Sequence, residues 1–163
     1  MIANEGDLEL YSQILPGLYM GGTDEDDVVV RARKRLATVS DPRPFDAVVS
    51  LDAYTLPVGW HVKELRYAFV DGALDKEQIE HIELVADWAF VEWKAGSKTL
   101  IRCLAGLNRS GLVIGLVLLR DGMKVEAVID LIREKRSEYA LHNDGFVEYL
   151  KKWEGRGAKV EQP

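Results

Sequence analysis

Residues 99–120 constrain the fold more than any other part of the chain. They begin with a short apolar strand, Thr99–Arg102, pass through a glycine-containing loop and continue as a helix over residues 110–120. The apolar run 112–119 is shorter than the roughly 20 residues that cross a bilayer, so it predicts a buried core helix. A buried strand that leads directly into a buried helix favours a layered α/β fold.

Other strands and helices alternate along the chain in the same way. We expect two short strands around the turn Pro16-Gly17, and further strands over residues 47–51 and 61–67. Amphipathic helices are expected over residues 28–36, 75–94 and 124–136, and from about Asn143 onwards. This order predicts a single layered α/β domain over residues 1–163, with a core over about 12–154, a loose tail at 155–163 and a mostly parallel central sheet flanked by helices.

The only cysteine among the 163 residues is Cys103, so a disulfide within the chain and a cysteine-rich zinc site are both excluded. A single free thiol fits a reducing compartment. The first seven residues lack the basic and apolar regions of a secretory signal, so we expect a cytoplasmic protein. No metal or other cofactor is expected, because the three histidines, His61, His81 and His142, have no ligand spacing.

The balance of charges limits the partners. With 21 basic and 27 acidic side chains the net charge is −6, which disfavours nucleic acids and membrane surfaces. A phosphorylated protein or peptide remains compatible with this charge if a positive potential is confined to one loop.

The loop 103–111 is the segment that can supply such a potential. Backbone N–H groups at the start of a helix point towards a bound oxyanion, and the helix dipole adds positive potential there. Arg109 can bind two phosphate oxygens at once, and the same positive potential favours the thiolate form of Cys103. We therefore expect Cys103 to attack a phosphorus atom bound by the loop residues Leu104, Ala105, Gly106, Leu107, Asn108 and Arg109.

The order cysteine, five residues, arginine, serine resembles the signature of the cysteine-dependent protein tyrosine phosphatase superfamily, and its dual-specificity branch in particular. Gly106 and Gly111 fit the same pattern. Residues 14–21 and 136–146 also resemble segments of that branch, so the resemblance covers about residues 12–154. It implies a phosphatase-like fold and hydrolysis of phosphotyrosine, and of phosphoserine or phosphothreonine in a shallow pocket, through a cysteinyl-phosphate intermediate.

The reaction needs a proton donor above the loop, which the family places on an aspartate roughly 30 residues before the cysteine. Asp71 and Asp75 both fit that spacing. Asp75 directly precedes a predicted helix and suits its N-cap, so Asp71 is the predicted acid. Ser110 is implied as the hydroxyl that stabilises the thiolate when it leaves.

Two supporting positions remain open at this point. Most relatives have a histidine before the nucleophile that helps to hold the thiolate, and this chain has Arg102, which is also cationic. Asn143 resembles the family's loop-supporting asparagine, but it also suits a helix N-cap.

Two other functions compete with a protein phosphatase. Asn108 before Arg109 also occurs in RNA 5′-phosphatases of the superfamily, although the acidic chain disfavours RNA. Because Arg102 is unusual at this position, the sequence is also compatible with a phosphate-binding module that has little turnover. Inositol phosphates are disfavoured, because Leu104, Ala105, Leu107 and Asn108 carry no charge.

Overall fold

The computed structural model describes residues 8–23, 43–59 and 61–160. Five strands form one sheet in the order β1, β2, β5, β3, β4. β1 and β2 form an antiparallel hairpin, and the other three pairings are parallel. The strands are β1 (Tyr11–Leu15), β2 (Leu18–Gly21), β3 (Ala47–Ser50), β4 (Lys63–Arg66) and β5 (Thr99–Arg102). The predicted α/β fold with a mostly parallel sheet is confirmed.

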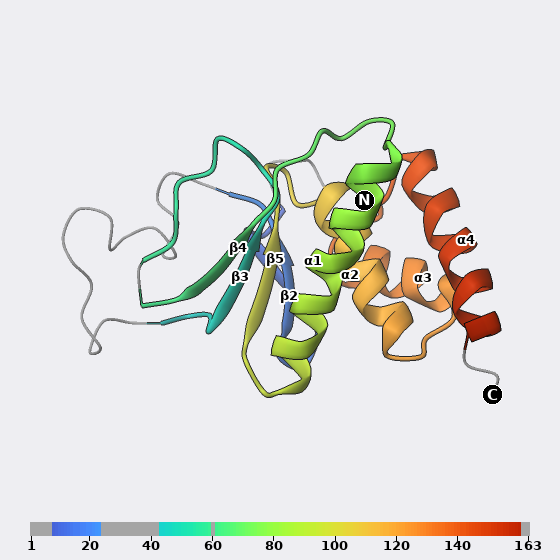
Figure 1. The fold of residues 1–163 in the computed structure, drawn as a ribbon. Helices are drawn as coiled ribbons and strands as arrows, with labels where there is room; N and C mark the ends of the chain where they lie inside the picture. Colours follow the sequence, from blue (N-terminus) through green and yellow to red (C-terminus); the bar gives the residue numbers. More distant parts are fainter. Residues whose placement is uncertain (1–7, 24–42, 60, 161–163) are drawn as a thin grey trace.

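Four helices follow in the described part of the chain: α1 (Lys76–Lys94), α2 (Arg109–Arg120), α3 (Val125–Lys135) and α4 (Asp144–Val160). They lie on the same side of the sheet, with α1 and α2 packed against its central strands (Figure 1). Among the described helices, none has the length and hydrophobicity that a membrane span requires.

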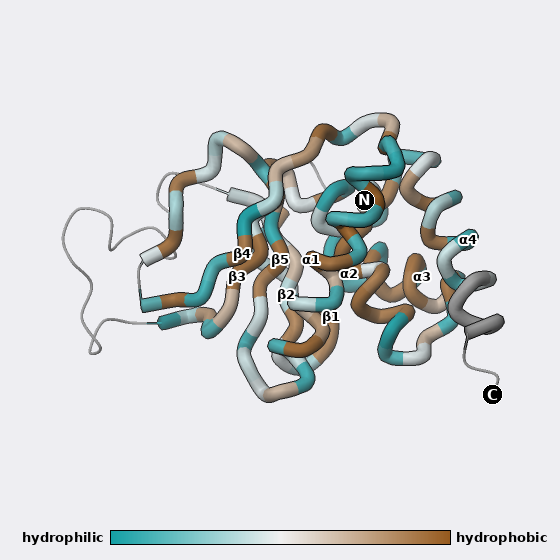
Figure 2. Tube along the Cα trace, viewed as in Figure 1, coloured by the Kyte–Doolittle hydropathy of each residue, from teal (hydrophilic) through white to brown (hydrophobic). Residues whose placement is uncertain are grey.

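Side chains of β5 alternate between two apolar clusters, as they must in a strand. Ile101 and Cys103 belong to the large core beneath the helices, and α2 adds its buried leucines and valines to that core. Leu100 packs on the opposite face with Val48 of β3 and Phe45. Figure 2 shows hydrophobic residues concentrated in the central strands and α2. Consecutive residues at the end of β5 therefore face different environments.

The predicted element boundaries hold to within a few residues, and the role predicted for Asp75 is confirmed. Its side chain accepts a hydrogen bond from the Gln78 backbone, and the Gln78 side chain accepts one from the Asp75 backbone, which makes a capping box. The predicted helix over residues 28–36 and the amino-terminal residues 1–7 lie outside the described residues.

In the segment for which we expected a loose tail, α4 continues to Val160, so residues 155–160 are helical. Glycine weakens a helix by about 1 kcal/mol without ending it. The preceding turns are anchored by Leu150 and Trp153, which pack on the core, so the helix passes through Gly155 and Gly157. Residues 161–163 lie outside the described part.

Candidate active site

Cys103 follows β5 directly and is only 2% exposed. Its sulfur accepts a hydrogen bond from the backbone N–H of Gly106 at 3.3 Å. The thiol donates to Oγ of Ser110, which lies in the first turn of α2, across 3.4 Å. The structure thus brings together the predicted nucleophile and the predicted hydroxyl, seven residues apart in the sequence.

The carbonyl oxygens of residues 104–108 accept hydrogen bonds from residues outside the loop. The carbonyl oxygen of Leu104 accepts from Thr23, that of Leu107 accepts from Leu141, and that of Asn108 accepts from Leu112. Arg136 binds the carbonyls of Ala105 and Gly106. In a trans peptide the C=O and the following N–H point in opposite directions. The five N–H groups of residues 105–109 therefore point into the loop, and that of Gly106 is seen to reach the sulfur.

The backbone conformation of this loop depends on Gly106. Its φ angle is +73°, a conformation that L side chains rarely adopt. A Cβ atom at this position would lie 2.5 Å from the backbone of Gly21 and 2.6 Å from the guanidinium of Arg136. A substitution would therefore push the loop away from both supports, and the N–H groups would lose their common direction.

Arg109 is held by one end of its guanidinium. Nη1 donates to the carbonyl oxygens of Phe69 (3.1 Å) and Leu51 (3.4 Å) and lies 3.7 Å from a carboxylate oxygen of Asp52. Within the described ranges, these are the polar contacts of its side chain. Nε and Nη2 thus remain for a ligand, and this pair can bind two oxygen atoms of a phosphate in parallel.

Arg136, in the turn after α3, supports the loop from below. It is 6% exposed and donates to the carbonyls of Ala105 and Gly106, to Oγ of Ser12 and to the backbone of Glu9. Burial lowers the pKa of Arg136, whereas the negative charge of a Cys103 thiolate, and that of Glu9, raise it. Arg136 therefore supports the loop that carries Cys103 through its hydrogen bonds to the Ala105 and Gly106 carbonyls.

Asp71 reaches the loop through two amide side chains. Nδ2 of Asn108 donates to one carboxylate oxygen, and Nδ2 of Asn143 donates to the other, both at 2.8 Å. Asn108 also accepts from the Asn143 backbone and contacts Nε2 of His142 at 2.9 Å. The structure therefore brings the predicted acid to the loop, while Asp75 serves as the helix cap.

Asn143 combines the two roles that the sequence left open. Its Oδ1 accepts from the backbone N–H of Phe146, which caps the first turn of α4, and its Nδ2 donates to Asp71. Asn143 thus supports Asp71, the predicted acid, and the Asn108 side chain. The Asn108 side chain accordingly faces Asp71 and Asn143, and the phosphate contact expected of this residue is left to its backbone.

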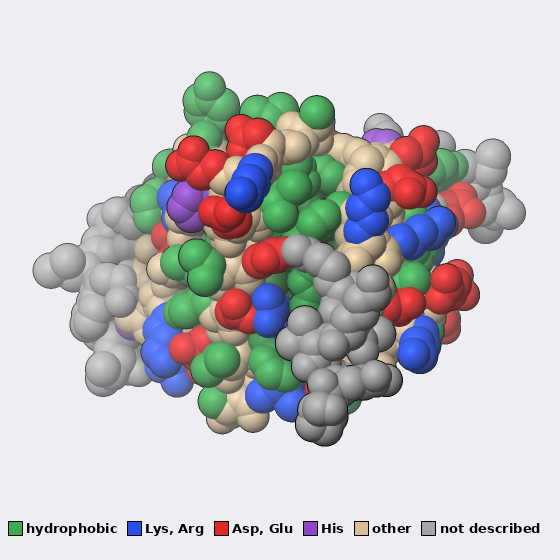
Figure 3. Space-filling view, turned by 45° about the vertical axis from the view of Figure 1, so that its right-hand side comes forward, with side chains coloured by type: hydrophobic (Ala, Val, Ile, Leu, Met, Phe, Trp, Pro, Cys, Tyr) green, Lys and Arg blue, Asp and Glu red, His purple; other side chains and the backbone are tan. Residues whose placement is uncertain are grey.

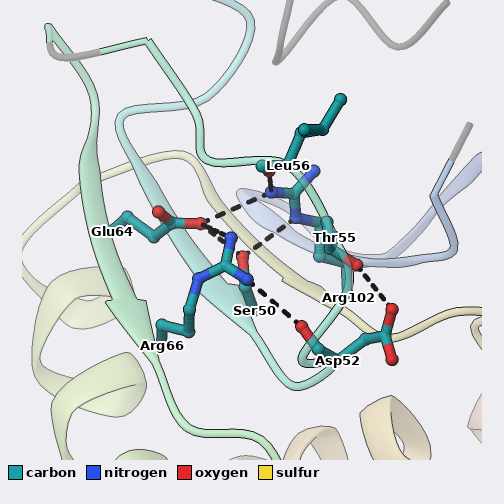
Figure 4. A network of polar contacts seen from close by, with 7 residues as sticks. All are labelled: Ser50, Asp52, Thr55, Leu56, Glu64, Arg66 and Arg102. Atoms are coloured by element: carbon teal, nitrogen blue, oxygen red, sulfur yellow. Dashed lines mark hydrogen bonds and ion pairs between the residues drawn. The ribbon is translucent and has the colours of Figure 1, made fainter. Parts of the chain in front are cut away.

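Arg102, whose role the sequence left open, points away from the side of the sheet on which Cys103 lies. Arg102 is fully buried on the sheet face opposite the helices. There it belongs to a polar network with Ser50, Glu64 and Arg66 (Figure 4). Its guanidinium donates to Oγ of Ser50 and to the carbonyl of Leu56, each at 3.0 Å, and to Glu64 at 3.4 Å. The physical reason is the alternation of side chains along β5, which sends Arg102 and Cys103 to opposite faces.

No family model matches the chain, but individual proteins do. A MAP kinase phosphatase with leucine-rich repeats from Dictyostelium discoideum is 26% identical over 89% of this chain and 16% of its own length. The human protein tyrosine phosphatase type IVA 3 is 36% identical over 44% of this chain and 43% of its own length. The crystal structure of human DUSP28 superposes with a TM-score of 0.74 at 19% identity, covering 92% of this chain and 96% of that one.

The chain is therefore similar in sequence to curated protein phosphatases. Its fold is that of the dual-specificity branch. The chain spans less than half the length of the two curated phosphatases named above.

Two residues of this phosphatase-like site escaped prediction from the sequence. Asp52 lies within 3.7 Å of Arg109 although the two are far apart in the chain. Arg136 was assigned only to a resembling segment, without a role at the loop. A signal existed for Arg136, since an arginine at the end of an amphipathic helix is a possible donor to nearby carbonyls, but nothing in the sequence indicated which carbonyls.

Proposed function

We propose that this chain is a phosphoric monoester hydrolase that removes phosphate from phosphotyrosine, and from phosphoserine or phosphothreonine, in a protein or peptide. The observation that carries the proposal is the orientation of the loop: its carbonyls are bound from outside, which turns five N–H groups towards the space above Cys103. Such a cradle suits the three non-bridging oxygens of a phosphate.

In the first step the Cys103 thiolate attacks the phosphorus, and an S–P bond forms as the P–O bond to the substrate breaks. The loop N–H groups and Arg109 bind the non-bridging oxygens, whose charge they stabilise in the transition state. Asp71, as the carboxylic acid, gives its proton to the leaving oxygen. The products are the dephosphorylated hydroxyl group and a phosphoryl group on Cys103.

In the second step a water molecule attacks the phosphorus, and the Asp71 carboxylate accepts its proton. The S–P bond breaks and inorganic phosphate leaves. The Ser110 hydroxyl, 3.4 Å from the sulfur, donates to the departing thiolate. Asn108 and Asn143 keep Asp71 at the loop through both steps.

Three variants test this proposal with an aryl phosphate and a phosphotyrosine peptide. Cys103→Ser is expected to abolish hydrolysis of both. Asp71→Asn is expected to lower kcat about 10²-fold or more on a substrate with a poor leaving group, while Asp75→Asn, the matched control, retains activity. Equal hydrolysis by wild type and Cys103→Ser would overturn the proposal, and a loss confined to Asp75→Asn would move the acid to that residue.

The contacts of the Asn108 side chain explain its presence beside Arg109 without reference to RNA. Faster release of phosphate from 5′-triphosphorylated RNA than from a phosphotyrosine peptide would nevertheless identify the chain as an RNA 5′-phosphatase. Tight binding of the phosphopeptide by wild type without product would identify a binding module.

A further inference from the structure

A groove of about 830 Å³ lies between the segment that follows Asp71, the first turn of α1 and the first turns of α4. Figure 3 shows hydrophobic side chains gathered in a hollow between α1 and α4, with acidic and basic side chains along its edges. The apolar lining consists mainly of Leu74, Ile79, Phe146 and Tyr149. Phe146 is fully buried, and the other three are partly exposed to the groove.

This groove lies beside the candidate active site. Asn143 lines the groove and donates to one oxygen of Asp71, whose other oxygen is bound by Asn108 of the loop. Gly72, the residue after Asp71, also lines it. Asn143 of the groove also donates directly to Asn108 of the loop, so the groove adjoins both the loop and Asp71, the proposed proton donor to the leaving oxygen.

The charges at the rim do not select a charged ligand. Glu148 and Lys152 line the groove with exposed side chains of opposite sign, and within residues 61–160 neither forms an ion pair. The floor is apolar, so the main gain on binding is the removal of apolar surface from water. An apolar side chain satisfies these conditions, and an extended polypeptide, which advances about 3.3 Å per residue, can carry it from the loop into the groove within a few residues.

We propose that the groove binds an apolar side chain of the same polypeptide whose phosphorylated residue occupies the loop, a few residues away from that residue. This inference rests on the proposed phosphatase function and names the class of substrate: a phosphopeptide with a leucine, isoleucine or phenylalanine flanking the phosphotyrosine. Such a contact is present before and during the reaction, so it lowers KM more than it raises kcat.

The test compares phosphotyrosine peptides that carry leucine or aspartate at one flanking position, with each of the four positions on either side examined in turn. At one or more positions wild type is expected to show a kcat/KM about fivefold to tenfold higher for leucine. Ile79→Ser, which makes the groove wall polar, is expected to remove most of that preference. Leu84→Ser is the matched control, because Leu84 lies on the same helix, is 63% exposed and is not part of the groove lining.

An aryl phosphate, which is too small to reach the groove, separates this inference from the proposed function. Hydrolysis of the aryl phosphate without any leucine preference overturns the groove assignment alone. A preference that survives in Ile79→Ser, or is lost equally in Leu84→Ser, also overturns it. If Ile79→Ser lowers kcat/KM for the aryl phosphate as much as for the leucine peptide, the groove acts on Asp71 and not on the peptide. No hydrolysis of either substrate overturns both proposals.

Discussion

Arg102 and Arg136 are both buried. Arg102 precedes Cys103 in the sequence and Arg136 binds the loop that follows Cys103, but the two arginines lie in different regions. Arg102 lies on the sheet face opposite the helices, where the carboxylate of Glu64 balances its charge. Arg136 lies under the phosphate loop, where its hydrogen-bond partners are neutral carbonyl and hydroxyl oxygens. Arg102 therefore shares a carboxylate with Arg66, whereas Arg136 binds the loop through neutral oxygens.

The region around Arg102 has a structural consequence for the site all the same. Arg102 binds the carbonyl of Leu56, and Arg66 binds the carbonyl of Asp52, so both arginines hold residues 52–56 to the sheet. A carboxylate oxygen of Asp52 in turn lies 3.7 Å from Arg109. The residue beside Cys103 thus acts on the fold of the sheet, whereas Arg136, far from Cys103 in the sequence, holds the loop around it.

The largest effect on activity is expected at the loop itself. Arg109→Lys keeps a positive charge but cannot bind two phosphate oxygens in parallel, so kcat/KM for an aryl phosphate should fall by about 10²–10³-fold. The matched control is Arg66→Lys in the Arg102 region, which should lower it by less than about threefold. Equal losses in the two variants would contradict the division into two regions.

A smaller loss is expected at Arg136. Arg136→Met removes the donors to the Ala105 and Gly106 carbonyls, at about 1.5–3 kcal/mol for each charged hydrogen bond, and should lower kcat/KM about 10- to 100-fold. Alkylation of Cys103 by iodoacetamide at neutral pH should change as well, because the Gly106 N–H that binds the sulfur loses its support. Arg136→Lys, which keeps a donor, should recover part of the wild-type rates. Unchanged kcat/KM and alkylation in a folded Arg136→Met protein would refute the support of the loop by Arg136.

The smallest effect on activity is expected at Arg102. Arg102→Leu leaves Glu64 with Arg66 as its remaining ion-pair partner and should lower the free energy of unfolding by about 2 kcal/mol, measured by urea denaturation. At temperatures where the variant is folded, kcat/KM and the alkylation rate should change by less than about threefold. A second substitution, Glu64→Gln, should restore part of the stability. A change in alkylation rate as large as that of Arg136→Met would show that Arg102 supports the thiolate after all.

Local patterns in the sequence were sufficient for much of this fold. The apolar strand Thr99–Arg102, the periodicity of α1 and the capping role of Asp75 depend on neighbouring residues, and all three agree with the structure. The order of Cys103, Arg109 and Ser110 likewise predicted a loop, in which the structure brings Cys103 and Ser110 together.

Contacts between distant segments could not be predicted from the sequence. The direction of the Arg102 side chain depends on the face that β5 turns towards the helices, and the place of Arg136 depends on how α3 packs beside the loop. The groove beside Asp71 exists only because α4 returns to the start of α1. Periodicity within one segment carries no information on these arrangements.

The central claim is that Cys103 attacks the phosphorus, and the most direct test is to trap the phosphoryl group on the protein. Wild type and Asp71→Asn are mixed with an aryl phosphate and denatured within milliseconds, and the digested peptides are analysed by mass spectrometry. We expect one phosphoryl group on the peptide that contains Cys103, in larger amount in Asp71→Asn, because loss of the base slows hydrolysis of the intermediate. A phosphoryl group on a different residue, or none on Cys103 while hydrolysis proceeds, would contradict the claim.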